Sequence, residues 1–146
     1  MILQLTPNTH PILHERVKSC SEDLDRREIS RILKENMVHY EGIGLSAIQI
    51  GIGERVFVMM LNMETEETIT CFNPRIIKRY VDCGWFEEGC LSFPDEIINI
   101  QRPNRIVVKY EDEDKKDHKI KLDGLAARVF LHEFDHLEGI VFTERQ

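Results

Sequence analysis

Three features are missing from this sequence, and each absence excludes a class of protein. No apolar run is long enough to span a bilayer, which excludes a helical membrane protein. The N-terminus lacks the pattern of a secretory signal peptide, so we expect a cytoplasmic protein. An excess of positive charge is also missing, because 19 Lys and Arg stand against 26 Asp and Glu, for a net charge of −7. This charge favours solubility and predicts no binding of nucleic acid or of an anionic membrane.

The chain also lacks the disulfide framework of a small secreted protein. Its four cysteines come without a secretory signal, so we interpret them as reduced thiols and candidate metal ligands. Internal repeats and low-complexity tracts are absent as well. A length of 146 residues, 42% of them hydrophobic and 31% charged, fits a single soluble domain with a core of its own.

The N-terminal part predicts an extended arm followed by one helix. Two prolines in residues 1–20 favour an extended segment with turns. In residues 21–40 the apolar side chains recur at helical spacing, and Asp25 followed by Glu28 predicts where the helix begins. Gly42 predicts where it ends. The apolar face comprises Leu24, Ile29, Ile32, Leu33, Met37 and Tyr40.

Most of the chain between residues 43 and 123 reads as short strands. A glycine-rich segment over residues 43–53 comes first. Residues 105–110 and 118–122 predict a hairpin across the charged turn 111–117. A second helix is expected over about residues 124–138, where Gly139 follows as a stop. A helix, several antiparallel strands and another helix indicate an α+β fold. The other expected strands are residues 55–61, 68–72, 75–81 and 97–100, with a loop or short strand over residues 85–94.

The second expected helix contains the motif His132-Glu133-Phe134-Asp135-His136. Residues four apart lie on one face of a helix, so both imidazoles can bind one metal ion. The glutamate between them can then reach a water on that metal. The alternative is an exposed amphipathic turn that happens to carry two histidines.

The motif supplies two ligands, whereas a catalytic metal usually takes three protein groups and leaves one position open. One class of metalloproteases has its third histidine where this chain has Phe142, which cannot bind a metal. Another class uses a glutamate on a later helix, and the sequence stops at Gln146 before one could form. We therefore expect the third ligand upstream, as a cysteine or as another histidine.

Three segments together resemble the peptide deformylase family in their order and spacing. The similarity runs from Pro7 nearly to the end of the chain. It implies metal-dependent hydrolysis of the N-formyl group from the N-terminal formyl-methionine of newly made polypeptides, with release of formate. It also implies antiparallel sheets packed around a C-terminal metal-binding helix, in a single domain over residues 1–146 that lacks the C-terminal helix of many bacterial relatives. The segments are Gly42-Ile43-Gly44-Leu45-Ser46-Ala47-Ile48-Gln49, Glu88-Gly89-Cys90-Leu91-Ser92 and His132-Glu133-Phe134-Asp135-His136.

The resemblance makes Cys90 the third ligand, beside His132 and His136. A thiolate and two neutral imidazoles suit one divalent ion, which is expected to be Fe(II) in vivo and which Zn(II), Ni(II) or Co(II) can replace in purified protein. Without the other motifs, Cys90 would be interpreted as a small buried side chain, and Cys83 is a rival ligand. Cys71 fits the core. The other histidines, His10, His14, His39 and His118, are expected on the surface.

By the same resemblance, Glu133 accepts a proton from the attacking water and delivers it to the departing amine. The side-chain amide of Gln49 and the backbone N–H of Leu91 are expected to stabilise the oxyanion. Gly44 would let the backbone approach the substrate closely. The plain alternatives are a helix-surface carboxylate for Glu133, a polar loop residue for Gln49 and an ordinary turn glycine for Gly44.

Methionine specificity requires an apolar pocket beside the metal. The peptide is expected to lie extended against the segment around Ile43–Leu45, or against the strand that contains Gly89, as an added strand. Two positions depart from the family pattern. Arg128 stands where an apolar residue is usual, and is expected either to close the pocket mouth or to point to solvent. Ile97 stands where many bacterial relatives carry a substrate-contacting arginine. The pocket positions that match the family are Ile43, Phe86, Leu125, Arg128 and Val129, and any of the apolar ones could equally belong to the core.

The expected partners are N-formyl-methionyl peptides, with no nucleic acid and no membrane. Contact with the ribosome is expected to be transient at most, because many bacterial relatives dock there through a basic C-terminal helix that this chain is expected to lack. Two other functions stay open. One is a peptidase that uses the same helix motif. The other is a non-catalytic domain whose metal is structural, and such a site is normally closed by four protein ligands.

Overall fold

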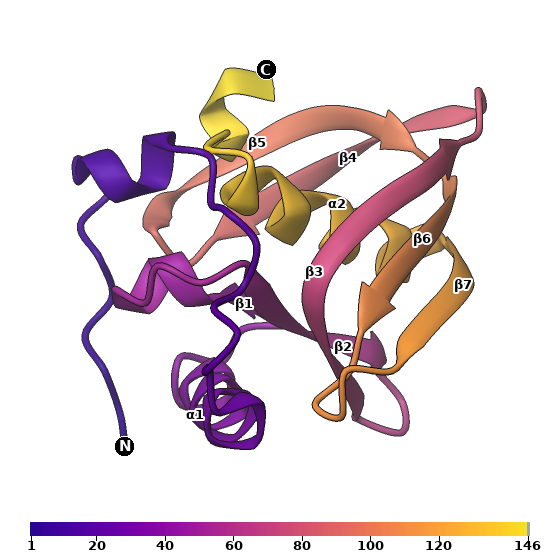
Figure 1. Cartoon of the computed structure of the whole chain (residues 1–146). Helices are drawn as coiled ribbons and strands as arrows, with labels where there is room; N and C mark the ends of the chain where they lie inside the picture. Colours follow the sequence, from indigo (N-terminus) through magenta and orange to yellow (C-terminus); the bar gives the residue numbers. More distant parts are fainter. Residues whose placement is uncertain (146) are drawn as a thin grey trace.

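The computed structural model describes residues 1–145, which form two antiparallel sheets with a helix between them (Figure 1). A five-stranded sheet has the strand order β1-β2-β3-β6-β7, and a two-stranded sheet pairs β4 with β5. The strands are β1 Gly44–Ser46, β2 Val56–Asn62, β3 Glu67–Arg79, β4 Cys83–Cys90, β5 Phe93–Pro103, β6 Arg105–Glu111 and β7 Asp117–Asp123. The helices are α1 Arg26–His39 and α2 Gly124–Leu137, with 3-10 turns η1 Pro11–His14, η2 Ala47–Ile50 and η3 Phe142–Arg145.

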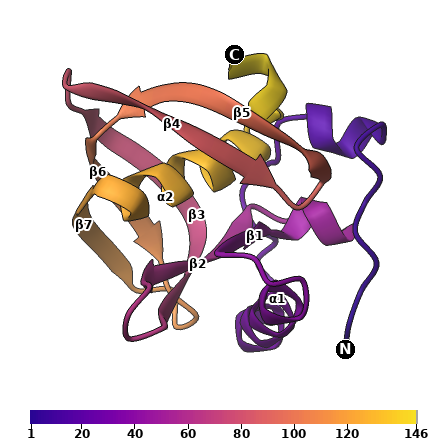
Figure 2. The same ribbon diagram turned by 180° about the vertical axis from the view of Figure 1, so that it is seen from behind.

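Helix α2 is the centre of the molecule. It lies behind β3 and β6 in Figure 1, and β4 and β5 cross in front of it in Figure 2. Its side chains are buried almost without interruption from Ala127 to Leu137, which is the pattern of a helix covered on all sides. Phe130 packs edge-on against Phe57 of β2, with ring centroids 5.1 Å apart. The α+β class and the placement of the C-terminal helix between sheets are therefore confirmed.

The predicted ends of both helices agree with local chemistry. The side chain of Asp25 accepts a hydrogen bond from the backbone N–H of Glu28, so Asp25 caps α1. Gly139 has a φ of +76° just after α2, the left-handed conformation that glycine adopts without strain. The predicted stop at Gly42 is wrong in detail, because Glu41 takes the left-handed conformation after α1, with a φ of +57°.

The strand predictions are correct in position and need two corrections. Residues 68–72 and 75–81 were expected as separate strands, but β3 runs through both. Asn73 adopts a φ of +49°, and the register with β6 shifts between Phe72 and Arg75, so the strand bends without ending. Residues 85–94 were expected as a loop or a short strand, and the strand alternative is correct in kind but too short, because β4 runs from Cys83 to Cys90 and pairs with β5 over nearly its whole length. The 105–110 and 118–122 hairpin is confirmed as β6 and β7.

Two absences hold for the part of the chain that the structure describes. No helix within residues 1–145 is long and apolar enough to cross a membrane. Their four cysteines are free thiols, and Cys71 lies in the core as expected, whereas Cys83 is exposed on β4. Cys83 is therefore not part of the group that Cys90 forms with His132 and His136, so it is no longer an alternative ligand.

Candidate metal centre

Three side chains from distant parts of the sequence meet beside α2. The ligand atoms of Cys90, His132 and His136 all lie within 4.8 Å of one another. Cys90 Sγ lies 3.4 Å from Nε2 of His136, and the two histidine rings are 5.1 Å apart between centroids. Metal–ligand bonds of about 2.0–2.3 Å place the ligand atoms of a tetrahedral ion at such separations. One thiolate and two imidazoles are also a donor set that binds Fe(II), Zn(II), Co(II) and Ni(II).

The buried polar atoms of the cluster fit a metal as well. Burial lowers the pKa of His136 well below its usual value, which keeps the imidazole in the neutral form that a metal requires. Its Nδ1 is one of the few buried side-chain polar atoms in residues 1–145 without a hydrogen-bond partner. Burial also lowers the pKa of His132, but hydrogen bonds with Cys90 and Glu88 raise it by more, to about 10. A metal ion would have to displace the proton of that imidazole, as ligand protons are displaced in metal sites generally.

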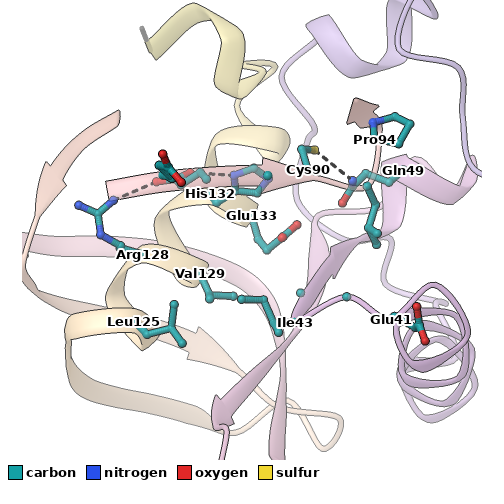
Figure 3. A pocket seen from close by; sticks show the side chains of 16 residues that line it. Glu41, Ile43, Gln49, Cys90, Pro94, Leu125, Arg128, Val129, His132 and Glu133 are labelled. Atoms are coloured by element: carbon teal, nitrogen blue, oxygen red, sulfur yellow. Dashed lines mark hydrogen bonds and ion pairs between the residues drawn. The ribbon is translucent and has the colours of Figure 1, made fainter. Parts of the chain in front are cut away.

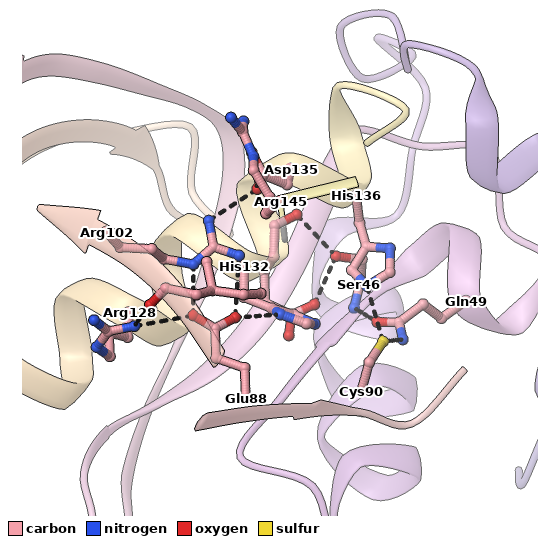
Figure 4. A network of polar contacts seen from close by, with 12 residues as sticks. Ser46, Gln49, Glu88, Cys90, Arg102, Arg128, His132, Asp135, His136 and Arg145 are labelled. Carbon is pink, nitrogen blue, oxygen red and sulfur yellow. Dashed lines mark hydrogen bonds and ion pairs between the residues drawn. The ribbon is translucent and has the colours of Figure 1, made fainter. Parts of the chain in front are cut away.

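His132 is held from behind by Glu88, as Figure 4 shows. Its Nδ1 lies 3.1 Å from Oε1 of Glu88, which directs Nε2 toward the cluster. Glu88 is clamped in turn by Arg102 through bonds of 2.6 and 3.0 Å. Burial raises the pKa of Glu88, but the hydrogen bonds from His132 and Arg102 outweigh it and lower the pKa to about 2. The carboxylate therefore stays charged at neutral pH.

The same network reaches the end of the described chain. Arg102 also donates to Asp135 of α2 at 2.9 Å. Arg145 of η3 donates twice to the same carboxylate, at 3.0 and 2.9 Å. A chain of ion pairs, buried except at Arg145, thus ties β4, β5, α2 and η3 together around the histidines (Figure 4).

Glu133 is buried, and its carboxylate lies against β1. The hydroxyl of Ser46 lies 2.9 Å from Oε1 of Glu133. Burial raises the pKa of this carboxyl above its usual value, partly offset by the charge of His132 and the bond from Ser46. A buried carboxyl with a raised pKa is suited to accept and return a proton near neutral pH. A Cβ added to Gly44 would lie 2.7 Å from Oε2 of Glu133, so only glycine fits beside it.

Gln49 presents its amide N–H group to the cluster. Its Oε1 accepts from the backbone N–H of Ser46 at 2.9 Å, which fixes the orientation of the amide. Nε2 then donates to Ser92 at 3.0 Å and lies 3.8 Å from Cys90 Sγ. The Ser-x-x-Gln pattern of residues 46–49 closes a capping box on η2, which holds Gln49 buried and rigid.

A cavity of about 440 Å³ opens beside the cluster (Figure 3). Eight substrate-binding residues were expected there from the sequence, and six of them line the cavity. Leu45 is fully buried in the core on the other side of β1. Phe86 is 52% exposed and lies outside the lining. The six are Ile43, Gly44, Gly89, Leu125, Arg128 and Val129, and the lining also includes Gln49, Cys90, Leu91, His132 and Glu133.

Arg128 does not point to solvent, so that one of the two sequence-based expectations is wrong. Its guanidinium is 7% exposed and donates to Glu88 at 3.1 Å and to the carbonyl of Gly84 at 2.5 Å. It also lies over the ring of Phe86, with 4.0 Å from Cζ to the centroid. The charge of Arg128 is therefore paired with the carboxylate of Glu88.

The positions of Glu88 and Ser46 beside the cluster, and the network behind them, were not expected from the sequence. A signal existed for two of them. Glu88 stands two residues before Cys90, so on a strand both point to the same face. Ser46 opens the Ser-x-x-Gln pattern. Nothing in the sequence indicated that Arg102, Asp135 and Arg145 would meet, because their pairing depends on how β5 and η3 lie against α2.

Comparison with known proteins agrees with the geometry. A family model described as polypeptide deformylase matches residues 2–146. The peptide deformylase of Thermotoga maritima is 41% identical over 138 residues, which is 92% of this chain and 81% of the relative. The crystal structure of peptide deformylase from Thermotoga maritima superposes with a TM-score of 0.92 at 36% identity, covering 99% of this chain and 97% of that one. A Met-Ala-Ser-bound class I type b peptide deformylase from Acinetobacter baumannii gives a TM-score of 0.91 at 27% identity, covering 100% and 99%.

Proposed function

This chain belongs to the polypeptide deformylase family, and we propose that Cys90, His132 and His136 hold the divalent metal on which its reaction depends. The reaction is hydrolysis of the N-formyl group from the N-terminal formyl-methionine of new polypeptides. The observation that carries the assignment of residues is the meeting of one thiol and two imidazoles at a cavity that also contains Glu133.

The metal, when bound, supplies a Lewis acid that polarises the formyl carbonyl and favours deprotonation of water. We infer that it is Fe(II) in vivo, and that Zn(II), Ni(II) or Co(II) can replace it. Three protein ligands are the number found in catalytic sites, whereas a structural site is usually closed by four. No further His, Cys, Asp or Glu joins the cluster among residues 1–145. This count supports an open, catalytic position over a structural one.

Glu133 is proposed as the proton carrier. As water oxygen adds to the formyl carbon, the carboxylate takes a proton from that water. The C–N bond then breaks, the proton passes to the departing amine, and formate leaves. Ser46 holds the carboxylate in place through its 2.9 Å contact. The raised pKa of Glu133 suits both halves of this transfer.

Gln49 and Leu91 are proposed to stabilise the oxyanion. Both line the cavity beside Cys90. Because its Oε1 is engaged by Ser46, the Gln49 amide can offer only N–H groups toward the cluster. Donors held in place before the reaction cost little reorganisation when the charge develops. The amide is therefore preorganised by the capping box rather than by the substrate.

The methionine side chain is proposed to enter the apolar part of the cavity, between Ile43, Leu125 and Val129, which Figure 3 shows together on one side. The peptide would continue as an added strand along β1, which lies at the end of the five-stranded sheet and, within residues 1–145, pairs only with β2. Gly44 permits close approach there. Leu45 can contribute only its backbone, because its side chain belongs to the core.

We further propose that residues 1–146 act as one catalytic unit in the cytoplasm, where new formylated chains are made and free thiols stay reduced. The net charge of −7 supports only transient contact with ribosomal RNA. The test is formate release from formyl-Met-Ala-Ser by protein of measured metal content. Cleavage of unformylated Met-Ala-Ser without formate release would indicate a peptidase instead.

A further inference from the structure

The turn η3 lies against the candidate metal centre without reaching the cavity. It follows α2 and lies beside β5 in both overall views (Figure 1, Figure 2). Its first residue, Phe142, is 1% exposed, whereas its last residue, Arg145, is exposed. Neither side chain lines the cavity, so any effect of η3 on the reaction must pass through the residues that η3 contacts.

Phe142 packs against the imidazole of His132. The two rings meet edge to face, with centroids 5.7 Å apart and planes inclined by 66°. The ring of Phe93 supports Phe142 at 5.5 Å between centroids. Phe142 also belongs to a small buried apolar cluster that includes Cys90. One aromatic side chain of η3 thus packs on one proposed ligand and shares an apolar cluster with a second, which limits how far the imidazole can tilt and keeps water away from it.

Arg145 reaches the same imidazole by a polar route, which Figure 4 shows. It donates to both carboxylate oxygens of Asp135, and Arg102 donates to one of them at 2.9 Å. Arg102 also holds Glu88, through bonds of 2.6 and 3.0 Å. Glu88 in turn lies 3.1 Å from Nδ1 of His132. The first and last residues of η3 therefore act on one histidine through two separate sets of contacts, one apolar and one charged.

We propose that Phe142 and Arg145 are positioning residues, through which η3 holds the imidazole of His132 in the orientation that the metal requires and slows release of the metal. The inference rests on the proposed function, in which His132 is a ligand. Groups behind a metal-bound histidine commonly change metal affinity by roughly 10- to 100-fold when they are replaced. Phe142 touches the ring directly and should lie near the lower value. Arg145 acts through three intervening side chains, and Asp135 keeps Arg102 without it, so roughly three- to fivefold is expected.

The test measures how fast Co(II)-loaded protein loses its metal to excess chelator, followed by the visible absorption of the bound ion. Phe142→Leu should release Co(II) roughly tenfold faster than the unsubstituted protein, and Arg145→Met roughly three- to fivefold faster. The visible bands report the geometry of the ligands, so they should shift in Phe142→Leu. Arg145→Lys restores the charge without the paired hydrogen bonds, and its release rate should fall between those of Arg145→Met and the unsubstituted protein.

Arg105→Met is the matched control, because Arg105 of β6 is also 42% exposed and pairs with one carboxylate, that of Asp82. It should release Co(II) at the rate of the unsubstituted protein, and thermal unfolding of the metal-free variants measures any general loss of stability. Release at the unsubstituted rate in both η3 variants would overturn the proposal, as would equal acceleration in Arg105→Met. Failure of the unsubstituted protein to bind one Co(II) would instead remove the proposed function, and this role of η3 with it.

Discussion

Oε1 of Glu88 lies 3.1 Å from Nδ1 of His132, so a carboxylate from β4 orients a histidine of α2. The two residues are 44 apart in sequence. Glu88 is also the carboxylate that binds Arg102 and Arg128. The position of one imidazole of the candidate metal centre therefore depends on how the two-stranded sheet packs against the helix.

Glu88→Gln should weaken metal binding by roughly 10- to 100-fold, because the neutral amide holds the imidazole less firmly. The substitution also removes the negative charge that pairs with the buried Arg102 and Arg128. The measurement is competition with a chelator, followed by the absorption of Co(II)-substituted protein. Asp82→Asn is the control, because Asp82 also pairs with an arginine but is exposed. Unchanged metal affinity in Glu88→Gln would mean that His132 is positioned by other contacts.

Glu133→Gln should retain the metal and lose at least about 10²- to 10⁴-fold in kcat, because the amide cannot accept and return a proton. Metal content by elemental analysis and formate release together check this. Asp135→Asn would be a poor control, since Asp135 holds two arginines. Glu138, which follows α2, is half-buried and pairs with Arg16 and Arg55, so Glu138→Gln is a less disruptive control. Substantial turnover in Glu133→Gln would assign proton transfer elsewhere.

Gly44→Ala should nearly abolish turnover, because the added Cβ would lie 2.7 Å from Glu133 and 3.0 Å from Val129. Either the carboxylate or the pocket wall must move. Gly53→Ala is the matched control, because a Cβ there meets nothing within 4 Å. Formate release and thermal unfolding of both variants separate a local effect at the site from a general loss of stability. Full activity of Gly44→Ala would show that the site accommodates the added methyl group without displacing Glu133 or Val129.

Metal identity should control survival in air. If Fe(II) is the working metal, activity should decay on exposure to oxygen, since a ferrous ion beside a thiolate is open to oxidation. The nickel-loaded protein should keep its activity over the same time. Parallel time courses of formate release, with free thiols counted at each point, would check this. Equal decay of both forms would point to a cause other than the metal.

The cysteines should differ sharply toward an alkylating reagent. Burial raises the pKa of Cys71 well above its usual value, so its reactive thiolate is scarce at pH 8 and becomes available only above that raised pKa or on unfolding. Cys83 is exposed and should react in the native protein. Mass spectrometry after a short iodoacetamide treatment distinguishes the two sites. Labelling of Cys71 in the native state would mean that β3 opens readily.

The sequence by itself determined the elements and the two candidate histidine ligands. Periodicity placed α1 and α2, Asp25 and Gly139 marked two of their ends, and four-residue spacing put His132 and His136 on one face. These features depend on local geometry, which is set by the order of residues along the chain. The resemblance added Cys90, although nothing local links it to the histidines.

Only the tertiary structure decided the surroundings of those ligands. In the structure, two predicted strands form the single strand β3, the side chain of Leu45 packs in the core, and Arg128 forms an ion pair with Glu88. Arg102, Asp135 and Arg145 also meet around α2. Each of these outcomes depends on which surfaces of distant elements face one another after packing, and a buried charge takes whichever opposite charge that packing brings within reach.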